Sequence, residues 1–252
     1  MNYRSPITNL LSGISWEGRR VTKKYRQGGQ GVEDVLTVQV MQALEFLPRH
    51  PFTYAWAQGV HGLNGAFSGF ISEGEAESAE YQFAPGGALS LRPTRETHQE
   101  RIEVQFDAHI ETSESQVFIE AKRMGTSSFQ EEQLARSYLI ALRESAPLKP
   151  RLLLILGSAP PVKVKNVGRT SIYDGILNNL RSVYDKTEGM EVSFERAVEL
   201  IPETVGYITW HELSLAIDTS LSEYSNPHYS TERAVQRVAS SLTRAVEWHA
   251  NA

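Results

Sequence analysis

The sequence predicts an α/β fold in which a mixed central sheet is flanked by helices. Segments with helical and strand-like patterns alternate in the order helix, three strands, helix, strand, helix, strand, which is typical of this class. One predicted strand, residues 151–157, is a continuous apolar run, as expected where both faces of a strand are buried. With 252 residues, 40% of them hydrophobic, the chain is long enough to form one large domain around a real core.

The first predicted element is a helix at residues 32–48. Its apolar side chains recur at helical spacing, and Pro48 ends the pattern. Residues 49–78 are rich in glycine, serine and aromatic residues, so we expect an irregular segment there. Alternating apolar and polar residues then predict three strands, at 79–83, 101–111 and 116–124.

A polar turn at residues 112–115 would pair the second and third strands antiparallel. The elements predicted after them are a helix at 129–145, the strand at 151–157, helices at 171–187 and 195–201, a strand at 205–210, a helix at 211–217 and a last helix from Ser230. We divide the single domain, residues 1–252, into a basic leader at 1–31, a core at 32–157 and an α/β extension at 158–252. The leader is either a solvated segment or a contact to nucleic-acid phosphate.

The composition excludes several classes of function. The formal net charge of −5 excludes a wholly basic surface, although a local basic patch beside an acidic metal site stays open. The lack of cysteine excludes disulfides, thiolate metal sites and a cysteine nucleophile. No stretch approaches the roughly 20 apolar residues of a membrane span, and the first residues lack the apolar core of a secretion signal. We therefore expect a cytoplasmic protein that does not bind membranes.

Three charged residues are predicted to converge at one end of the sheet. Glu120 and Lys122 are two apart on one strand and therefore face the same way. Asp107, on the preceding strand, falls near the level of Glu120 if the strands pair around the polar turn. Two carboxylates suit Mg²⁺, which prefers oxygen ligands and activates a bound water, and a nearby lysine can stabilise a developing anion. The alternative is an ordinary surface ion pair between Lys122 and one of the acids, worth about 0–1 kcal/mol.

Asp107 and, after twelve intervening residues, Glu120-Ala-Lys122 resemble the signature of the PD-(D/E)XK nuclease superfamily, to which restriction endonucleases and many repair and phage nucleases belong. The similarity covers residues 32–157, where the order helix, three strands, helix, strand is similar to the shared core. The resemblance implies a restriction-endonuclease-like core. It also implies that Asp107 and Glu120 ligate Mg²⁺ together with the carbonyl of Ala121, that Mn²⁺ can substitute, and that Lys122 is the catalytic lysine.

The same resemblance points to two further residues. Many members add an acid from the first helix, and Glu33 is the matching position here, with Glu45 as the alternative in that helix. The next helix often supplies a polar residue, for which Gln133 is the candidate. The sequence departs from the usual pattern at Phe106, where a proline often precedes the motif aspartate, and at Tyr138, which lies five residues rather than four after Gln133.

The function implied by the resemblance is that of a Mg²⁺-dependent nuclease hydrolysing phosphodiester bonds, with DNA as the expected substrate and RNA left open. Restriction, defence or repair is the expected setting, and a homodimer would suit cleavage of two strands. The alternative is a catalytically inactive nucleic-acid- or protein-interaction module on the same fold. His109, two residues from Asp107 on the same strand face, is either a neighbour of the site or an ordinary strand histidine.

Overall fold

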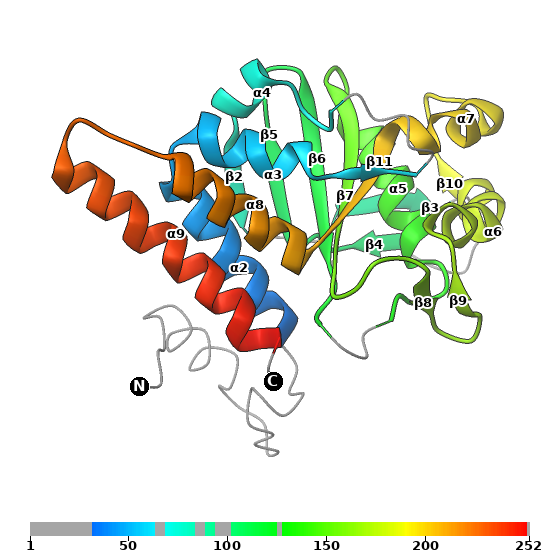
Figure 1. The fold of residues 1–252 in the computed structure, drawn as a ribbon. Helices are drawn as coiled ribbons and strands as arrows, with labels where there is room; N and C mark the ends of the chain where they lie inside the picture. The colour runs from blue at the N-terminus through cyan, green and yellow to red at the C-terminus, as the bar shows by residue number, and fades with distance from the viewer. Residues whose placement is uncertain (1–31, 64–68, 84–88, 94–101, 125–127, 251–252) are drawn as a thin grey trace, which may run out of the picture.

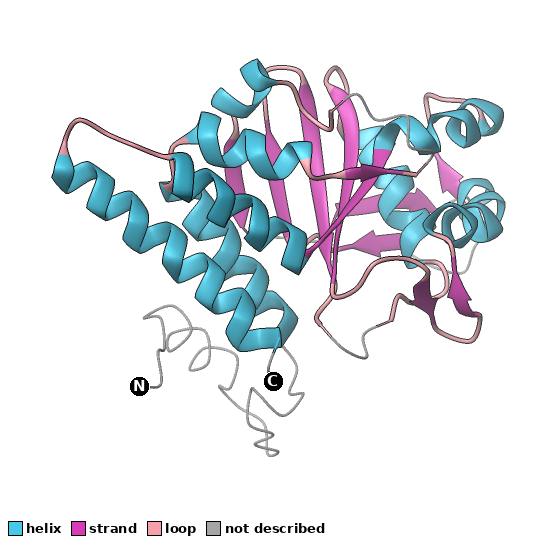
Figure 2. Cartoon of the chain, viewed as in Figure 1, coloured by secondary structure: helices cyan, strands magenta, loops and turns pink. Residues whose placement is uncertain are grey.

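The computed structural model describes residues 32–63, 69–83, 89–93, 102–124 and 128–250 of the chain. In these residues six strands form a mixed sheet in the order β1-β11-β7-β6-β5-β2, and helices cover both of its faces (Figure 1, Figure 2). The predicted α/β class, a mixed central sheet flanked by helices, is confirmed. The leader predicted at residues 1–31 lies outside the described residues.

The sheet has three parallel strands at its centre and antiparallel pairings on both sides of them. Its strands, in spatial order, are β1 (His61–Gly62), β11 (Val205–Thr209), β7 (Lys149–Leu156), β6 (Ser115–Ala121), β5 (Ala108–Glu111) and β2 (Glu80–Phe83). β6, β7 and β11 run parallel to one another, whereas β5 and β2 follow β6 as antiparallel neighbours. The carboxyl ends of β6, β7 and β11 therefore meet at one edge of the sheet, the lower edge in Figure 1.

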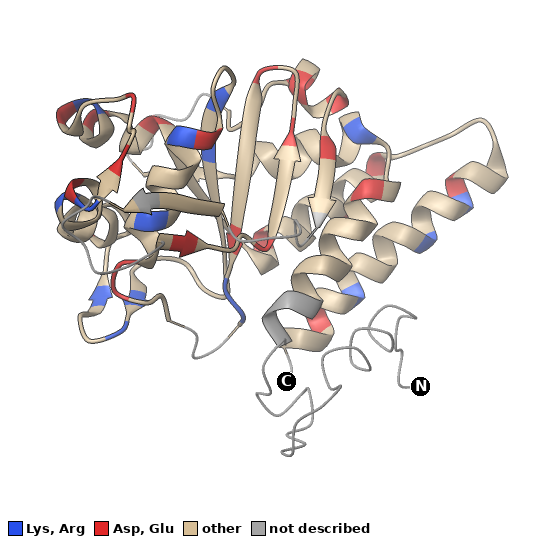
Figure 3. Ribbon diagram, turned by 180° about the vertical axis from the view of Figure 1, so that it is seen from behind, with Lys and Arg blue, Asp and Glu red and all other residues tan. Residues whose placement is uncertain are grey.

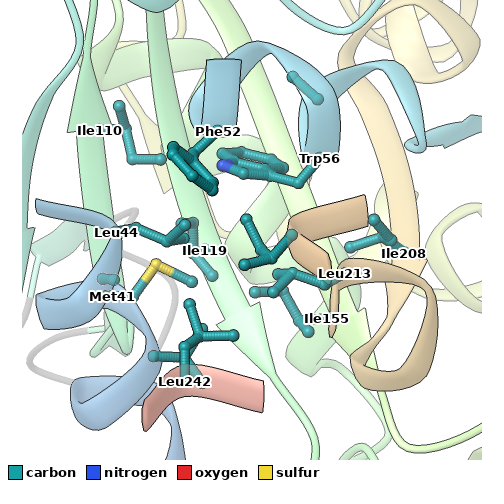
Figure 4. Close-up of a cluster of buried hydrophobic side chains, with 14 of the residues drawn as sticks. Met41, Leu44, Phe52, Trp56, Ile110, Ile119, Ile155, Ile208, Leu213 and Leu242 are labelled. Atoms are coloured by element: carbon teal, nitrogen blue, oxygen red, sulfur yellow. The ribbon is translucent and has the colours of Figure 1, made fainter. Parts of the chain in front are cut away.

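One face of the sheet is covered by long helices from both ends of the chain and by short ones between them. These are α2 (Val32–Phe46), η2 (Arg49–Tyr54), α3 (Ala55–Gln58), α4 (Glu73–Glu77), α8 (Trp210–Glu223) and α9 (Tyr229–Ala250). Figure 4 shows side chains from this layer, such as Met41 and Leu213, gathered over Ile119 of β6 and Ile155 of β7. Because α2 packs against α9, segments far apart in the sequence build a single core.

The other face is covered by α5 (Gln133–Glu144), α6 (Ile172–Asp185) and α7 (Phe194–Thr204). Side chains of a strand alternate between its two faces, so Phe118 of β6 and Leu154 of β7 pack here while their neighbours point to the first layer. By the same alternation Glu120 and Lys122 fall on the α5 face. The core thus consists of two apolar clusters separated by the sheet.

Smaller strands lie outside the main sheet. β3 (Leu89–Pro93) pairs with β4 (Ile102–Val104) and with β10 (Thr187–Glu188), and β8 (Val162–Val164) forms a hairpin with β9 (Gly168–Thr170). None of the helices in the described ranges is long and apolar enough to cross a membrane.

The single strand predicted at 101–111 is wrong. The structure divides it into β4 and β5, and β4 pairs with β3 outside the main sheet. At the break, Phe106 is buried with its ring centroid 4.8 Å from that of Phe118, in the cluster on the α5 face. Phe106 packs on the α5 face, whereas Ala108 of β5 packs on the other face, so the chain changes face at the break and Asp107 lies outside the strand ladder.

Other boundaries also differ from the predictions. The segment 49–78 is partly helical, because it contains η2, α3 and α4. The helix predicted at 129–145 begins only at Gln133, the strand predicted at 116–124 ends at Ala121, and the helix predicted at 211–217 continues to Glu223. The late start of α5 matters for function, since it places Gln133 at the amino end of the helix rather than inside it.

Candidate active site

Strand register brings the predicted acids to the same level of the sheet. Ala108 of β5 pairs with Ile119 of β6, so the next residues outward, Asp107 and Glu120, stand opposite each other. The antiparallel pairing expected around the polar turn is confirmed. Both residues lie at the edge where β6, β7 and β11 end.

Asp107 is fixed by the backbone of β6. Its Oδ2 accepts a hydrogen bond from the backbone N–H of Ala121 at 2.7 Å, and its own N–H donates to the carbonyl of Ile119 at 3.0 Å. The side chain is partly buried. The aspartate therefore stands beside the Glu120-Ala-Lys122 segment even though it is not part of β5.

Glu120 is the centre of the polar cluster. Its side chain is only 5% exposed, and its Oε1 accepts hydrogen bonds from Nζ of Lys122 at 2.8 Å and from Nε2 of Gln133 at 2.5 Å. Burying a carboxylate is costly unless charged or polar partners compensate, and here an ammonium and an amide do so. Side chains from β6 and from α5 thus meet on one oxygen.

The backbone of Lys122 makes two hydrogen bonds, although the residue lies just beyond the end of β6. Its N–H donates to the carbonyl of Ile155 at 2.7 Å, and its carbonyl accepts from Nε1 of Trp210 at 2.9 Å. The following turn lies against the end of β7, where a Cβ added to Gly157 would stand 2.4 Å from the Arg123 carbonyl oxygen. Only glycine permits this approach of two backbones.

The ammonium of Lys122 is partly enclosed. The side chain is 13% exposed, and Nζ lies 5.0 Å from the centroid of the Phe129 ring, a cation–π contact. Between this ring and Glu120, the lysine has a restricted position. It is therefore not the ordinary surface ion pair that the sequence left open.

Gln133 reaches Glu120 because of the late start of α5. It is the first helical residue, and its Oε1 accepts from the backbone N–H of Gln130 at 3.1 Å while Nε2 donates to the glutamate. With both ends of the amide engaged, its orientation is set. The sequence placed Gln133 in this helix by resemblance, and the structure supplies the contact.

The remaining candidates have different outcomes. Glu33 lies in the first turn of α2, where the structure describes the backbone alone, so its role as a ligand stays a prediction. The alternative in that helix, Glu45, accepts from Arg49 at 2.9 Å near the opposite end of α2.

His109 is buried and stacked on Phe118 with ring centroids 5.1 Å apart. Burial lowers the pKa of His109, because it disfavours the charged ring. The negative charge of nearby Glu111 has the opposite effect but is weaker, so the uncharged ring is favoured.

The donor set fits a hard divalent cation. Mg²⁺ is usually held by one or two carboxylates together with waters and substrate phosphate, and Asp107 and Glu120 supply that number. Within the ranges that the structure describes, no group of three or more Asp, Glu or His side chains is arranged around a common point.

Two pockets flank the cluster. One, of about 290 Å³, is lined by Lys122, Arg123, Phe129 and the β8–β9 hairpin, including Lys163 and Arg169. The other, of about 540 Å³, is lined by Gln133 with a set of acidic and amide residues, namely Glu103, Gln105, Gln130, Glu131 and Glu132, and by Val104 and Arg136. Glu120 and its two partners therefore separate a basic pocket from a largely acidic one.

The cations of the β8–β9 hairpin were not predicted as functional residues from the sequence. A local signal existed, since no Asp or Glu occurs between Glu144 and Asp174 while lysine and arginine do. Comparisons with models of protein families, with curated proteins and with solved structures found no match to this chain. The function is therefore inferred from the sequence and the geometry of the chain itself.

Proposed function

We propose that the chain is a metal-dependent nuclease that hydrolyses phosphodiester bonds, with DNA as its expected substrate. The observation that supports this most directly is the meeting of Glu120, Lys122 and Gln133 at one buried carboxylate oxygen, with Asp107 bonded to the adjacent backbone. A carboxylate pair with a placed ammonium at a sheet edge suits phosphodiester hydrolysis. The PD-(D/E)XK resemblance, which is carried by the same residues, implies the same chemistry.

In this proposal the residues have separate roles. Asp107 and Glu120 would hold Mg²⁺ with the carbonyl of Ala121, and Glu33 is the candidate for a further ligand. The bound ion would polarise the phosphate and lower the pKa of a water. Lys122 places a positive charge where the phosphate oxygens gain negative charge. Gln133 holds the carboxylate of Glu120 in one orientation and acts as a positioning residue.

The proposal is tested by incubating the protein with circular and linear DNA, and with RNA, in Mg²⁺, Mn²⁺, Ca²⁺ or excess EDTA. We expect cleavage with Mg²⁺ and Mn²⁺ only, because Ca²⁺ suits carboxylate oxygens but prefers looser geometry. The matched pair of variants is Asp107→Asn at the site and Glu111→Gln, an exposed carboxylate at the other end of β5. Only Asp107→Asn should lose cleavage.

Two results would count against the proposal. Full activity in EDTA would show that cleavage does not need a metal ion. Equal activity of the two variants would show that Asp107 is not part of the active site. A folded wild-type chain that binds nucleic acid but never cleaves it would favour the non-catalytic interaction module instead.

A further inference from the structure

The β8–β9 hairpin carries exposed cations in a chain of net charge −5. Lys163, Lys165 and Arg169 are all exposed, and across the described residues none of the three has an ion-pair partner. Seen from behind, the hairpin and the turn that follows β6 both carry basic residues at the same end of the molecule (Figure 3). A cluster of unneutralised cations is an electrostatic footprint for an anionic partner.

The register of the hairpin places two of these cations face to face. Lys163 and Arg169 are direct partners across β8 and β9, and Lys165 follows in the turn that joins the two strands. Like charges directly opposite each other in an antiparallel pair are destabilising. Local costs of this kind are expected at functional sites, where a bound ligand of opposite charge offsets them.

The hairpin is tied to the candidate active site by backbone hydrogen bonds. The N–H of Phe129 donates to the carbonyl of Lys163 at 2.9 Å, and the N–H of Lys165 donates to the carbonyl of Phe129 at 2.9 Å. The ring of the same phenylalanine lies beneath Nζ of Lys122. The positions of the hairpin cations relative to the candidate catalytic lysine are therefore fixed through one residue.

The pocket of about 290 Å³ lies between the hairpin cations and Lys122. Its lining includes Lys122 and Arg123 on one side, and Lys163 and Arg169 on the other. Its volume of about 290 Å³ is small for a ligand pocket, and the cations along the hairpin are exposed rather than enclosed. This arrangement suits a segment of a long polyanion better than a small enclosed anion.

We propose that the β8–β9 hairpin binds the phosphodiester backbone of the nucleic acid beside the candidate active site. The inference rests on the proposed function and assigns it a substrate-binding element. Lys163 lies in β8, Arg169 lies opposite it in β9, and Lys165 lies in the turn between them, so the hairpin offers several exposed cations to successive phosphates of one strand. The acidic residues that line the pocket on the far side of Glu120 repel phosphate. The backbone therefore approaches from the hairpin side and reaches Lys122 across the basic pocket.

The test compares two matched double variants. Lys163→Gln/Arg169→Gln removes the facing cations of the hairpin, and Arg233→Gln/Arg237→Gln removes two exposed arginines of α9, on the opposite layer of the molecule. Binding of labelled duplex DNA and of RNA is measured by fluorescence anisotropy in Ca²⁺, over a series of salt concentrations. Cleavage in Mg²⁺ is measured separately under single-turnover conditions.

We expect the hairpin variant to bind at least about tenfold more weakly at 0.1 M salt. The slope of log affinity against log salt concentration should fall by about 2 for duplex DNA, because each lost phosphate contact releases one counterion fewer. The α9 variant should keep the wild-type slope. At limiting nucleic acid, the hairpin variant should cleave more slowly in line with its weaker binding, whereas the α9 variant should cleave at the wild-type rate.

The outcomes separate this inference from the proposed function. If both double variants lose affinity and slope equally, or if the hairpin variant keeps both, the hairpin is not the binding element. A wild-type chain that binds with the expected slope but does not cleave would overturn the nuclease proposal and leave the hairpin assignment standing. A slope change with DNA alone, or with RNA alone, assigns the hairpin to that polymer.

Discussion

Two glutamates are buried near opposite ends of β6, and they are stabilised in different ways. Glu75 of α4 packs at the start of the strand and accepts hydrogen bonds from the Ser115 hydroxyl at 2.5 Å, the Thr112 hydroxyl at 3.2 Å and the Ser72 N–H at 2.8 Å. Glu120, near the end of the strand, has a cation among its partners. Burial alone therefore does not distinguish a structural carboxylate from a functional one.

The nature of the donors makes the distinction. All three donors to Glu75 are neutral and close in the fold, and two of them bind one oxygen while the backbone binds the other. Burial would raise the pKa of Glu75, but the hydrogen bonds from Ser115, Ser72 and Thr112 outweigh it and hold that pKa below its usual value. Oε1 of Glu120 accepts instead from an amide and from the ammonium of a lysine that lines a pocket. The first arrangement stabilises the fold, and the second holds charged groups at an accessible edge.

The largest effect is expected from Glu120→Gln. Removing the charge while keeping the shape should lower the cleavage rate by at least about 10³-fold, because the carboxylate is a proposed metal ligand. The variant should still unfold cooperatively, since an amide oxygen remains to accept from Lys122 and Gln133. The measurement is single-turnover cleavage alongside thermal unfolding. Wild-type cleavage by this variant would place Glu120 in the same structural class as Glu75.

Lys122→Ala is expected to reduce the cleavage rate by about 10²-fold or more. The ammonium serves a charge that develops only in the transition state, so nucleic-acid affinity in Ca²⁺ should change by no more than a few-fold. Lys122→Arg should restore little, since the guanidinium is bulkier and planar beside the Phe129 ring. Equal losses of affinity and rate would instead assign Lys122 to substrate binding.

Gln133→Ala tests the positioning role within the same cluster. Partners that orient metal ligands typically contribute about 10–100-fold to metal affinity or activity. We therefore expect the Mg²⁺ concentration for half-maximal cleavage to rise within that range. Gln130→Ala is the matched control, because Gln130 contacts Gln133 through its backbone N–H and keeps that contact. An unchanged Mg²⁺ dependence in Gln133→Ala would mean that its contact with Glu120 is incidental.

The polar cluster could be predicted in part because its geometry is local. A period of two places Glu120 and Lys122 on one face, and a short hairpin brings Asp107 to their level. The contact of Gln133 depends on where α5 starts, and the departure of Asp107 from the strand depends on burial of Phe106. Both are set by packing against distant segments, which a single sequence pattern does not contain.

The buried position of Glu75 could not be predicted from the sequence for another reason. Glu75 lies in the segment 49–78, whose glycine and serine content indicated irregular structure. A local signal was nevertheless present, because Ser72 and Glu75 have the spacing of a capping box and form one at the start of α4. The hydroxyls that complete the network belong to Thr112, in the turn after β5, and to Ser115, the first residue of β6. Strand pairing alone does not bring these residues to α4.

Glu75→Gln should have the smallest effect on cleavage and a clear effect on stability. Replacing the carboxylate weakens its charged hydrogen bonds, so the free energy of unfolding at pH 7 should fall by about 2 kcal/mol, while the folded variant cleaves at the wild-type rate. The pKa of Glu75 is lower in the folded chain than in the unfolded chain, so the unfolded state binds the proton more readily. This contribution to stability is therefore complete above the unfolded-state pKa, and it is lost as the pH falls through the folded-state pKa. Urea unfolding of both proteins should show the difference between them shrinking below about pH 5. A constant difference down to pH 3, or a loss of cleavage in the folded variant, would remove the distinction drawn between the two buried glutamates.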